Sequence, residues 1–172
     1  PSQETLADLE AAVTLDLGPT TIGAIAVAPS DPNVIYVGSG EHAVRGQSST
    51  YGDGVYKSLN GGKTWTNMGL KNSEHIARIL IDPRDPDVVY AAAEGPLWSP
   101  GGERGLFKSV DGGRTWTPSL IISADTGVAS AEFDPGDPDI LYAAAYQRRR
   151  SVAAFLGGGP ESGIYKSEDA GK

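Results

Sequence analysis

The sequence predicts an all-β fold built from β-propeller blades: about three four-stranded antiparallel sheets of a larger propeller, or of one completed by several chains. Three observations support this. A Pro-x-Asp-Pro motif recurs at blade-sized intervals, a second motif recurs in step with it, and 23 glycines and 12 prolines among 172 residues provide many tight turns. Two motifs that keep the same period indicate one repeated structural unit.

The first motif joins two apolar runs. Its three copies read IGAIAVAPSDPNVIYVGS, IARILIDPRDPDVVYAAA and VASAEFDPGDPDILYAAA, at 22–39, 76–93 and 128–145. The marker prolines Pro29, Pro83 and Pro135 are 54 and 52 residues apart. Because proline cannot donate to a strand ladder, the motif predicts a turn between two strands, 22–28 and 34–38 in the first copy.

The second motif, Ser-x-Asp-x-Gly-x-Thr-Trp, has Asn in place of Asp in the first copy and stops before Thr-Trp in the third. Its copies comprise Ser58, Asn60, Gly62, Thr64 and Trp65; Ser109, Asp111, Gly113, Thr115 and Trp116; and Ser167, Asp169 and Gly171. The Asn or Asp can accept backbone N–H groups, and the glycine can take a positive φ, so the motif predicts a hairpin between the third and fourth strands. Both tryptophans are expected to be largely buried over these turns.

These motifs resemble the BNR or Asp-box repeats of sortilin-type and glycosyl hydrolase-like β-propellers, over residues 20–172. The resemblance implies blades at about 20–70, 71–122 and 123–172, the last truncated. The segment 1–19 stays unassigned, with a short helix near 5–13 or a remnant of a preceding blade as alternatives. Because three blades cannot close a ring, the remaining blades are expected from the parent chain or from a homo-oligomer.

Three long loops, at 40–53, 94–104 and 146–162, are expected on the face opposite both motifs. Insertions on one face of a repeat array usually mark the binding face. Three adjacent arginines suit a grip on carboxylates or phosphates, although they can equally pair with neighbouring acids. The candidate ligand-binding residues are Glu41, His42, Arg45, Trp98, Arg148, Arg149 and Arg150.

Composition excludes several classes of function. A net charge of −8 argues against nucleic acid as a partner, and the absence of cysteine excludes thiolate chemistry. The two histidines, His42 and His75, make only a weak case for a metal site or a general base, so structural or surface roles are preferred, and the glycines at 157–159 lack the context of a phosphate loop. We therefore expect no metal, cofactor or membrane insertion. An extracellular or periplasmic location is implied by the resemblance alone.

Two functions remain. The first is a binding or scaffold module that holds a peptide, a protein or a glycan through the long-loop face or the central channel. The alternative is part of a sialidase- or xyloglucanase-like glycoside hydrolase, which needs paired carboxyl groups. Glu41, Glu74, Asp125 and Glu132 are candidates, but none lies in a motif that identifies a catalytic residue, so binding is preferred. An exposed Trp98 would favour a ligand face.

Overall fold

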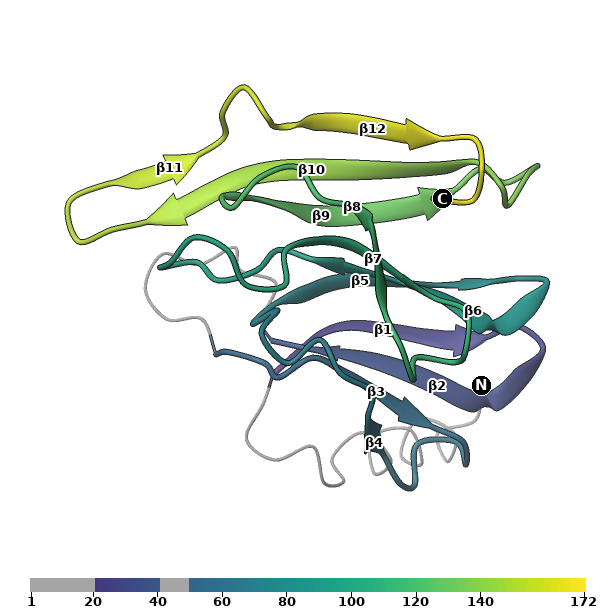
Figure 1. Ribbon diagram of the computed structural model, residues 1–172. Helices are drawn as coiled ribbons and strands as arrows, with labels where there is room; N and C mark the ends of the chain where they lie inside the picture. The colour runs from purple at the N-terminus through teal and green to yellow at the C-terminus, as the bar shows by residue number, and fades with distance from the viewer. Residues whose placement is uncertain (1–20, 41–49) are drawn as a thin grey trace, which may run out of the picture.

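The computed structural model describes residues 21–40 and 50–172, and within these ranges it contains strands and no helix. This confirms the predicted all-β class (Figure 1). The strands are β1 (Ile22–Ala28), β2 (Asp31–Ser39), β3 (Val55–Ser58), β4 (Thr66–Asn67), β5 (Ile76–Asp82), β6 (Asp85–Ala93), β7 (Gly105–Ser109), β8 (Thr117–Leu120), β9 (Thr126–Phe133), β10 (Leu141–Arg150), β11 (Phe155–Gly157) and β12 (Gly163–Ser167).

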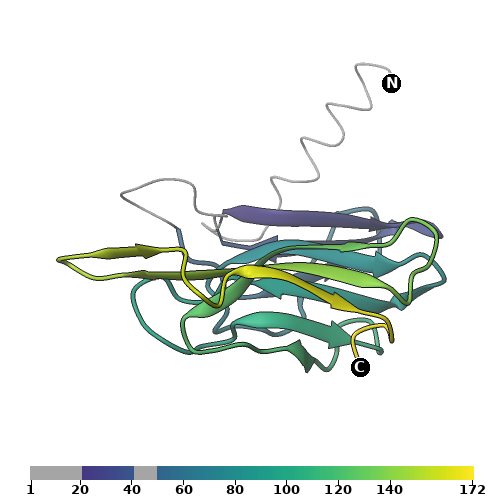
Figure 2. The ribbon, with the colours of Figure 1, turned by 90° about the horizontal axis from the view of Figure 1, so that it is seen from above.

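Three antiparallel sheets are stacked face to face, each corresponding to one blade (Figure 1). The first two are meanders, in the orders β1-β2-β3-β4 and β5-β6-β7-β8. In the third, β10 pairs with β9 and β12, while β11 pairs only with the far end of β10. β11 is therefore not the counterpart of β4 and β8. The β10–β11 hairpin forms an arm that extends beyond the stack (Figure 2).

The Pro-x-Asp-Pro turns of the first two blades are tighter than expected, whereas in the third β9 ends at Phe133 and β10 begins at Leu141. β2 begins at Asp31 instead of residue 34, and Ala28 pairs directly with Asp31. The Asp31 carboxylate accepts the Asn33 N–H at 2.9 Å, and Asp85 and Asp137 accept the equivalent N–H groups in the other blades. This side-chain cap fixes the backbone locally, so the strand tolerates a proline next to its first residue.

The second motif forms a turn that we call the Ser-Gly turn, at 58–65, 109–116 and 167–172. In the first copy the Ser58 hydroxyl accepts the N–H groups of Asn60 and Gly62, and the Asn60 side chain accepts the Thr64 N–H at 2.9 Å. The second copy repeats these bonds with Ser109 and Asp111. Local hydrogen bonding therefore explains these residue types without a ligand.

Each Ser-Gly turn also lies beside the Pro-x-Asp-Pro turn of its own blade. The N–H groups of Gly61, Gly112 and Ala170 donate to the carbonyls of Asn33, Asp87 and Asp139, at 3.0, 2.8 and 2.7 Å. The two motifs thus occupy the same end of the stack.

The core lies between the blades. Ile79 and Ile81 of the second blade are 3% and 8% exposed against the first, whereas their counterparts Ile25 and Val27, on the face of the first blade that no other described blade covers, are 54% and 48% exposed. At the other flank, Ile164 is 80% exposed. Burial in this chain is therefore set by whether a blade has a neighbour.

Trp65 and Trp116 are both partly buried and neither is exposed, which is consistent with the expectation that the two rings are largely covered. Trp116 packs against the core between the first two blades, and its indole N–H donates to the Met68 carbonyl at 2.7 Å.

Candidate functional site

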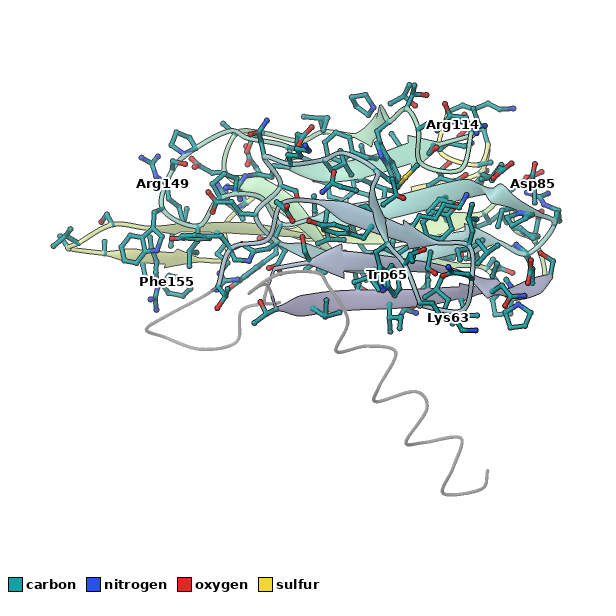
Figure 3. All side chains as sticks on the ribbon, turned by 90° about the horizontal axis from the view of Figure 1, so that it is seen from below. Lys63, Trp65, Asp85, Arg114, Arg149 and Phe155 are labelled. Atoms are coloured by element: carbon teal, nitrogen blue, oxygen red, sulfur yellow. The ribbon has the colours of Figure 1, made fainter. Side chains whose placement is uncertain are left out.

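The described long loops converge at the end of the stack opposite the Ser-Gly turns. Leu97 accepts the Arg150 N–H at 2.8 Å, and Ala124 accepts the Gly101 N–H at 2.7 Å, so the loop of the second blade is tied to the third. In Figure 3, Arg149 and Phe155 lie at this end, whereas Lys63, Asp85 and Arg114 lie at the other. We call the segments 71–75, 94–104, 122–126 and 146–162 the loop end.

A buried arginine organises the loop end. Arg104 is 3% exposed, and its guanidinium donates to the backbone carbonyls of Glu94, at 2.7 Å, and of Pro96. Burial lowers the pKa of Arg104, while the charges of Asp125, Glu74 and Glu94 oppose this effect. Because a guanidinium keeps its proton even when buried, Arg104 acts as a fixed positive charge that holds the loop.

The arginine run divides among three environments. Arg148 is 8% exposed and forms an ion pair with the buried Glu94, with 3.5 Å between Nη1 and Oε2. Arg149, half-exposed, lies 3.6 Å from Asp125. Arg148 is therefore not available at the surface, and both contacts match the alternative in which the arginines pair with neighbouring acids.

Arg150 lies close to two exposed aromatic rings. Its guanidinium carbon is 5.8 Å from the ring centroid of Trp98 and 5.2 Å from that of Phe155. Trp98 is 50% exposed and Phe155 is 53% exposed. Arginine next to aromatic faces in this range is a cation–π arrangement. We call these three residues the aromatic platform; it presents apolar ring surface and a guanidinium together at the loop end.

Glu74 occupies an unusual position in the connection between the first and second blades. Its φ is 56°, a left-handed conformation that few residues other than glycine adopt. Its carbonyl accepts the Gly52 N–H at 2.7 Å. Burial raises the pKa of Glu74, against the opposing effects of the nearby Leu97 backbone and of the Arg104 charge.

The remaining candidates are placed as follows. Glu41, His42 and Arg45 lie outside the described residues. His75 is buried, with its ring centroid 5.8 Å from that of Tyr51. Glu132 lies on β9 toward the opposite end of the stack, in an exposed ion pair with Arg78, so it is not part of the loop end.

Two features were not anticipated from the sequence. Phe155 joins the platform because the β10–β11 hairpin pairs it with Arg150, a register that no motif signals. Glu161 accepts hydrogen bonds from Ser123 and Thr126, and these bonds lower the pKa of Glu161. The two hydroxyl residues lie more than thirty positions away, so only the fold brings them to Glu161.

Other site types find no support in the described part of the chain. It contains no group of three or more His, Cys, Asp or Glu residues placed to hold a metal ion. It also contains no helix long and apolar enough to cross a membrane.

Neither a protein-family model nor a curated protein matches the sequence. Solved structures do match. An ancestral GH74 enzyme aligns with a TM-score of 0.59 and 22% identity, over 87% of this chain and 17% of its own. The GH74 enzyme of Niastella koreensis gives 0.58 and 23%, over 84% and 19%. The GH74 xyloglucanase of Xanthomonas campestris gives 0.58 and 17%, over 86% and 21%.

These matches concern the fold. The chain spans about a fifth of the length of the three enzymes, and the identities are too low to transfer an activity. GH74 enzymes are β-propeller glycoside hydrolases, so the matches confirm the propeller architecture and support the glycosyl hydrolase-like part of the expected resemblance. They do not support its sortilin-type or BNR part.

Proposed function

We propose that the loop end binds a glycan, as part of a propeller of the glycoside hydrolase type. The observation that carries the proposal is the aromatic platform, in which Trp98 and Phe155 keep half of their surface exposed and both lie close to Arg150. A large aromatic ring left half-exposed at a loop cluster is a feature of binding surfaces.

The chemistry of the platform suits a sugar better than a purely apolar ligand. A pyranose offers C–H groups on its faces and hydroxyls at its edge, so it can stack on a ring and accept hydrogen bonds at the same time. Arg150 and the half-exposed Arg149 supply donors beside the rings. A peptide or protein ligand, which the sequence also allowed, does not require this combination.

The buried charges make the platform rigid. Arg104 holds the carbonyls that precede Trp98, and the Arg148–Glu94 pair fixes β10 against the same loop. Side chains held by packing and hydrogen bonds lose little freedom on binding, which favours affinity. We infer that Arg148 holds β10 in place through its ion pair with Glu94 and does not contact the ligand.

Glycan hydrolysis is the second candidate, and Glu74 is the observation that favours it. A carboxyl group whose pKa is raised by burial suits a general acid, and left-handed backbone at non-glycine residues clusters at functional sites. The candidate predicts that the chain releases reducing sugar from a glucan, that Glu74→Gln abolishes release, and that Glu132→Gln preserves it. Absence of release would remove this candidate and leave the binding proposal standing.

We further assign the Ser-Gly turns to the Asp-box type. The identical hydrogen bonds of the first two copies support this assignment. Because these turns lie at the end away from the platform, they serve the fold in this account and take no part in recognition.

Affinity electrophoresis tests the binding proposal. The chain should be retarded in a native gel that contains xyloglucan, and Trp98→Ala should restore its free mobility. Val110→Ala is the matched control, because Val110 is 66% exposed at the opposite end of the stack. Retardation that survives Trp98→Ala, or no retardation by xyloglucan or by a sialylated glycan, would contradict the proposal.

A further inference from the structure

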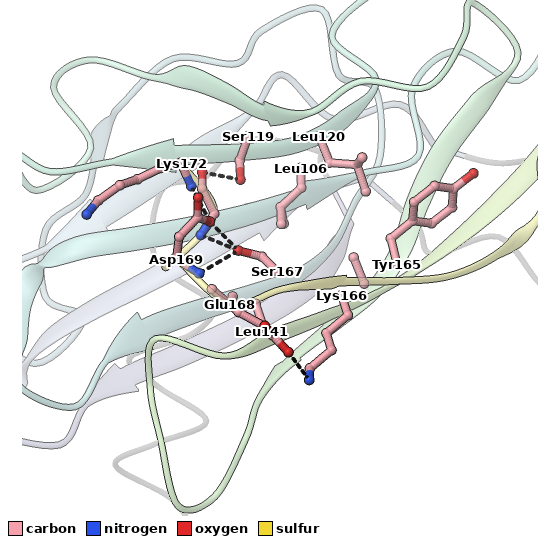
Figure 4. Close-up of a pocket in the computed structure, with 12 residues that line it drawn as sticks. Leu106, Ser119, Leu120, Leu141, Tyr165, Lys166, Ser167, Glu168, Asp169 and Lys172 are labelled. Carbon is pink, nitrogen blue, oxygen red and sulfur yellow. Dashed lines mark hydrogen bonds and ion pairs between the residues drawn. The ribbon is translucent and has the colours of Figure 1, made fainter.

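The first Ser-Gly turn differs from the other two at a position that carries a key side chain. Asn60 stands where the second and third copies have Asp111 and Asp169. In the third copy the Ser167 hydroxyl donates to the Asp169 carboxylate at 2.7 Å (Figure 4), and the second copy makes the same bond at 2.8 Å. In the first copy Ser58 donates to the amide oxygen of Asn60 at 3.0 Å. The three side chains therefore occupy equivalent places and differ in chemistry.

The amide and the carboxylate make nearly the same contacts. Asp111 accepts the Thr115 N–H at 2.9 Å on one oxygen and the Thr115 hydroxyl at 2.7 Å on the other. Asn60 accepts the Thr64 N–H at 2.9 Å, and its Nδ2 donates to the Thr64 hydroxyl at 2.9 Å. Because a threonine hydroxyl can either donate or accept, an aspartate at position 60 would keep these contacts after rotation of that hydroxyl. The first turn can therefore hold an aspartate without a change in its backbone.

Asn60 is followed by glycine, the residue that obstructs deamidation least because it has no side chain. Asn60 is exposed, and the atom nearest to a Cβ on Gly61 would be Oδ1 of Asn33, at 3.6 Å, so the turn is open beside this glycine. The other asparagines of the chain, Asn33, Asn67 and Asn72, are followed by valine, methionine and serine. Their neighbours carry side chains that hinder the approach of the backbone nitrogen to the amide carbon.

Hydrogen bonds occupy both reacting groups of the first turn. The Gly61 N–H donates to the Asn33 carbonyl at 3.0 Å, and the amide oxygen of Asn60 accepts the Thr64 N–H. Both bonds have to open before the Gly61 nitrogen can reach the side chain of Asn60. They lie in an exposed turn at the end of the stack, where local opening costs far less free energy than unfolding of the whole chain. The turn therefore slows deamidation and does not prevent it.

We propose that Asn60 is a site of spontaneous deamidation, and that the resulting L-aspartate gives the first blade the carboxylate that the other two blades encode. The Gly61 nitrogen bonds to Cγ of Asn60, and Nδ2 leaves as ammonia with the proton of the Gly61 N–H. Water then opens the cyclic imide. Cleavage between the Gly61 nitrogen and Cγ gives L-aspartate, whereas cleavage between that nitrogen and the backbone carbonyl carbon gives isoaspartate, which lengthens the main chain and breaks the spacing of the turn.

Peptide mapping by mass spectrometry tests the proposal on the folded 172-residue chain, incubated in mildly alkaline buffer. The acid form should accumulate at Asn60 at least about tenfold faster than at Asn67 or Asn72, because glycine leaves the backbone nitrogen unobstructed. Conversion should be slower than in a free peptide of residues 57–65 by about a hundredfold at most, because the exposed turn opens locally.

Two sets of variants test the role of the turn. Thr64→Val removes the hydroxyl that holds Nδ2 of Asn60 and should speed its conversion, whereas Thr66→Val, at an exposed position of β4, should leave the rate unchanged. Asn60→Asp reproduces the L-aspartate product directly. At neutral pH it should melt at the same temperature as the unaltered chain or above it.

Four results would overturn the proposal. They are conversion at Asn60 no faster than at Asn67 and Asn72, no conversion in the folded chain by the time the free peptide has reacted completely, equal rates for Thr64→Val and Thr66→Val, and a lower melting temperature for Asn60→Asp. None of these outcomes bears on glycan binding, because the Ser-Gly turns lie at the end of the stack away from the loop end.

Discussion

The Nζ of Lys108 donates a 2.6 Å hydrogen bond to the carbonyl of Ala170, joining the second blade to the Ser-Gly turn of the third. The Tyr90 hydroxyl donates to the same carbonyl at 2.7 Å. One blade earlier, Lys57 makes the equivalent contact with the Gly112 carbonyl. The blades are therefore linked by a repeated lysine bridge in addition to the apolar core.

This bridge makes a stability prediction. Lys108→Met should lower the free energy of unfolding by about 1–2 kcal/mol, because it leaves a partly buried carbonyl without its charged donor. Lys166→Met is the control, since Lys166 is half-exposed on the free flank and pairs with Glu168. Urea denaturation should show little change for the control, and equal losses for the two variants would argue against the bridge.

The left-handed backbone conformation of Ala170 predicts that a glycine at this position would stabilise the protein. Its φ is 55°, whereas glycines occupy the equivalent positions 61 and 112, at 68° and 72°. Ala170→Gly should therefore raise the free energy of unfolding by about 1 kcal/mol, through removal of the left-handed strain. Gly112→Ala should lower the free energy of unfolding by about 1 kcal/mol, because alanine at a φ of 72° takes on the same left-handed strain. Thermal melts of both variants test the pair, and a lower midpoint for Ala170→Gly would contradict the explanation.

The lowered pKa of Asp111 predicts how the stability of the protein changes at acidic pH. Hydrogen bonds from Thr115 and Ser109 lower the pKa of Asp111 from 3.8 to about 2. Because the folded-state pKa is below the unfolded one, the stabilisation is complete above about pH 4 and is lost as the pH falls toward 2. Asp111→Asn, which imitates Asn60 of the first blade, should reduce this loss. Urea midpoints between pH 2 and 5 measure the difference, and parallel curves for the two proteins would refute it.

The two motif tryptophans should respond differently to loss of the indole N–H. Trp116→Phe should cost about 1 kcal/mol beyond the loss of ring area, because the Met68 carbonyl loses its donor. The Trp65 N–H is buried and has no hydrogen-bond partner in the described part of the chain. Trp65→Phe should therefore cost less. Chemical denaturation of the two variants compares them directly, and the reverse order would contradict the assigned contacts.

Sequence patterns predicted the repeat because its determinants are local. Ser58, Asn60 and Gly62 act within a few residues, so residue type and spacing were sufficient to predict a hairpin turn. The strand that follows Pro29 starts at Asp31, three residues before the predicted start, because the Asp31 carboxylate caps the backbone of the turn.

The loop end was predictable only in outline. The number of strands in each blade predicts which end of the stack carries the long loops. Trp98 is a candidate because it lies outside the repeated motif. The burial of Arg148 depends on Glu94, 54 positions away in another blade, and sequence spacing carries no signal of that pairing. The contribution of Phe155 depends on the β10–β11 register, which is likewise a property of the folded chain.

The most direct test of glycan recognition at the loop end uses the three tryptophan indole N–H resonances, one each from Trp65, Trp98 and Trp116. Assignment by single Trp→Phe variants would identify each signal in a ¹H–¹⁵N spectrum. During titration with a xyloglucan oligosaccharide, the Trp98 resonance should shift with saturation while the other two stay in place. An unmoved Trp98 signal, or a shift confined to Trp65 or Trp116, would contradict the account.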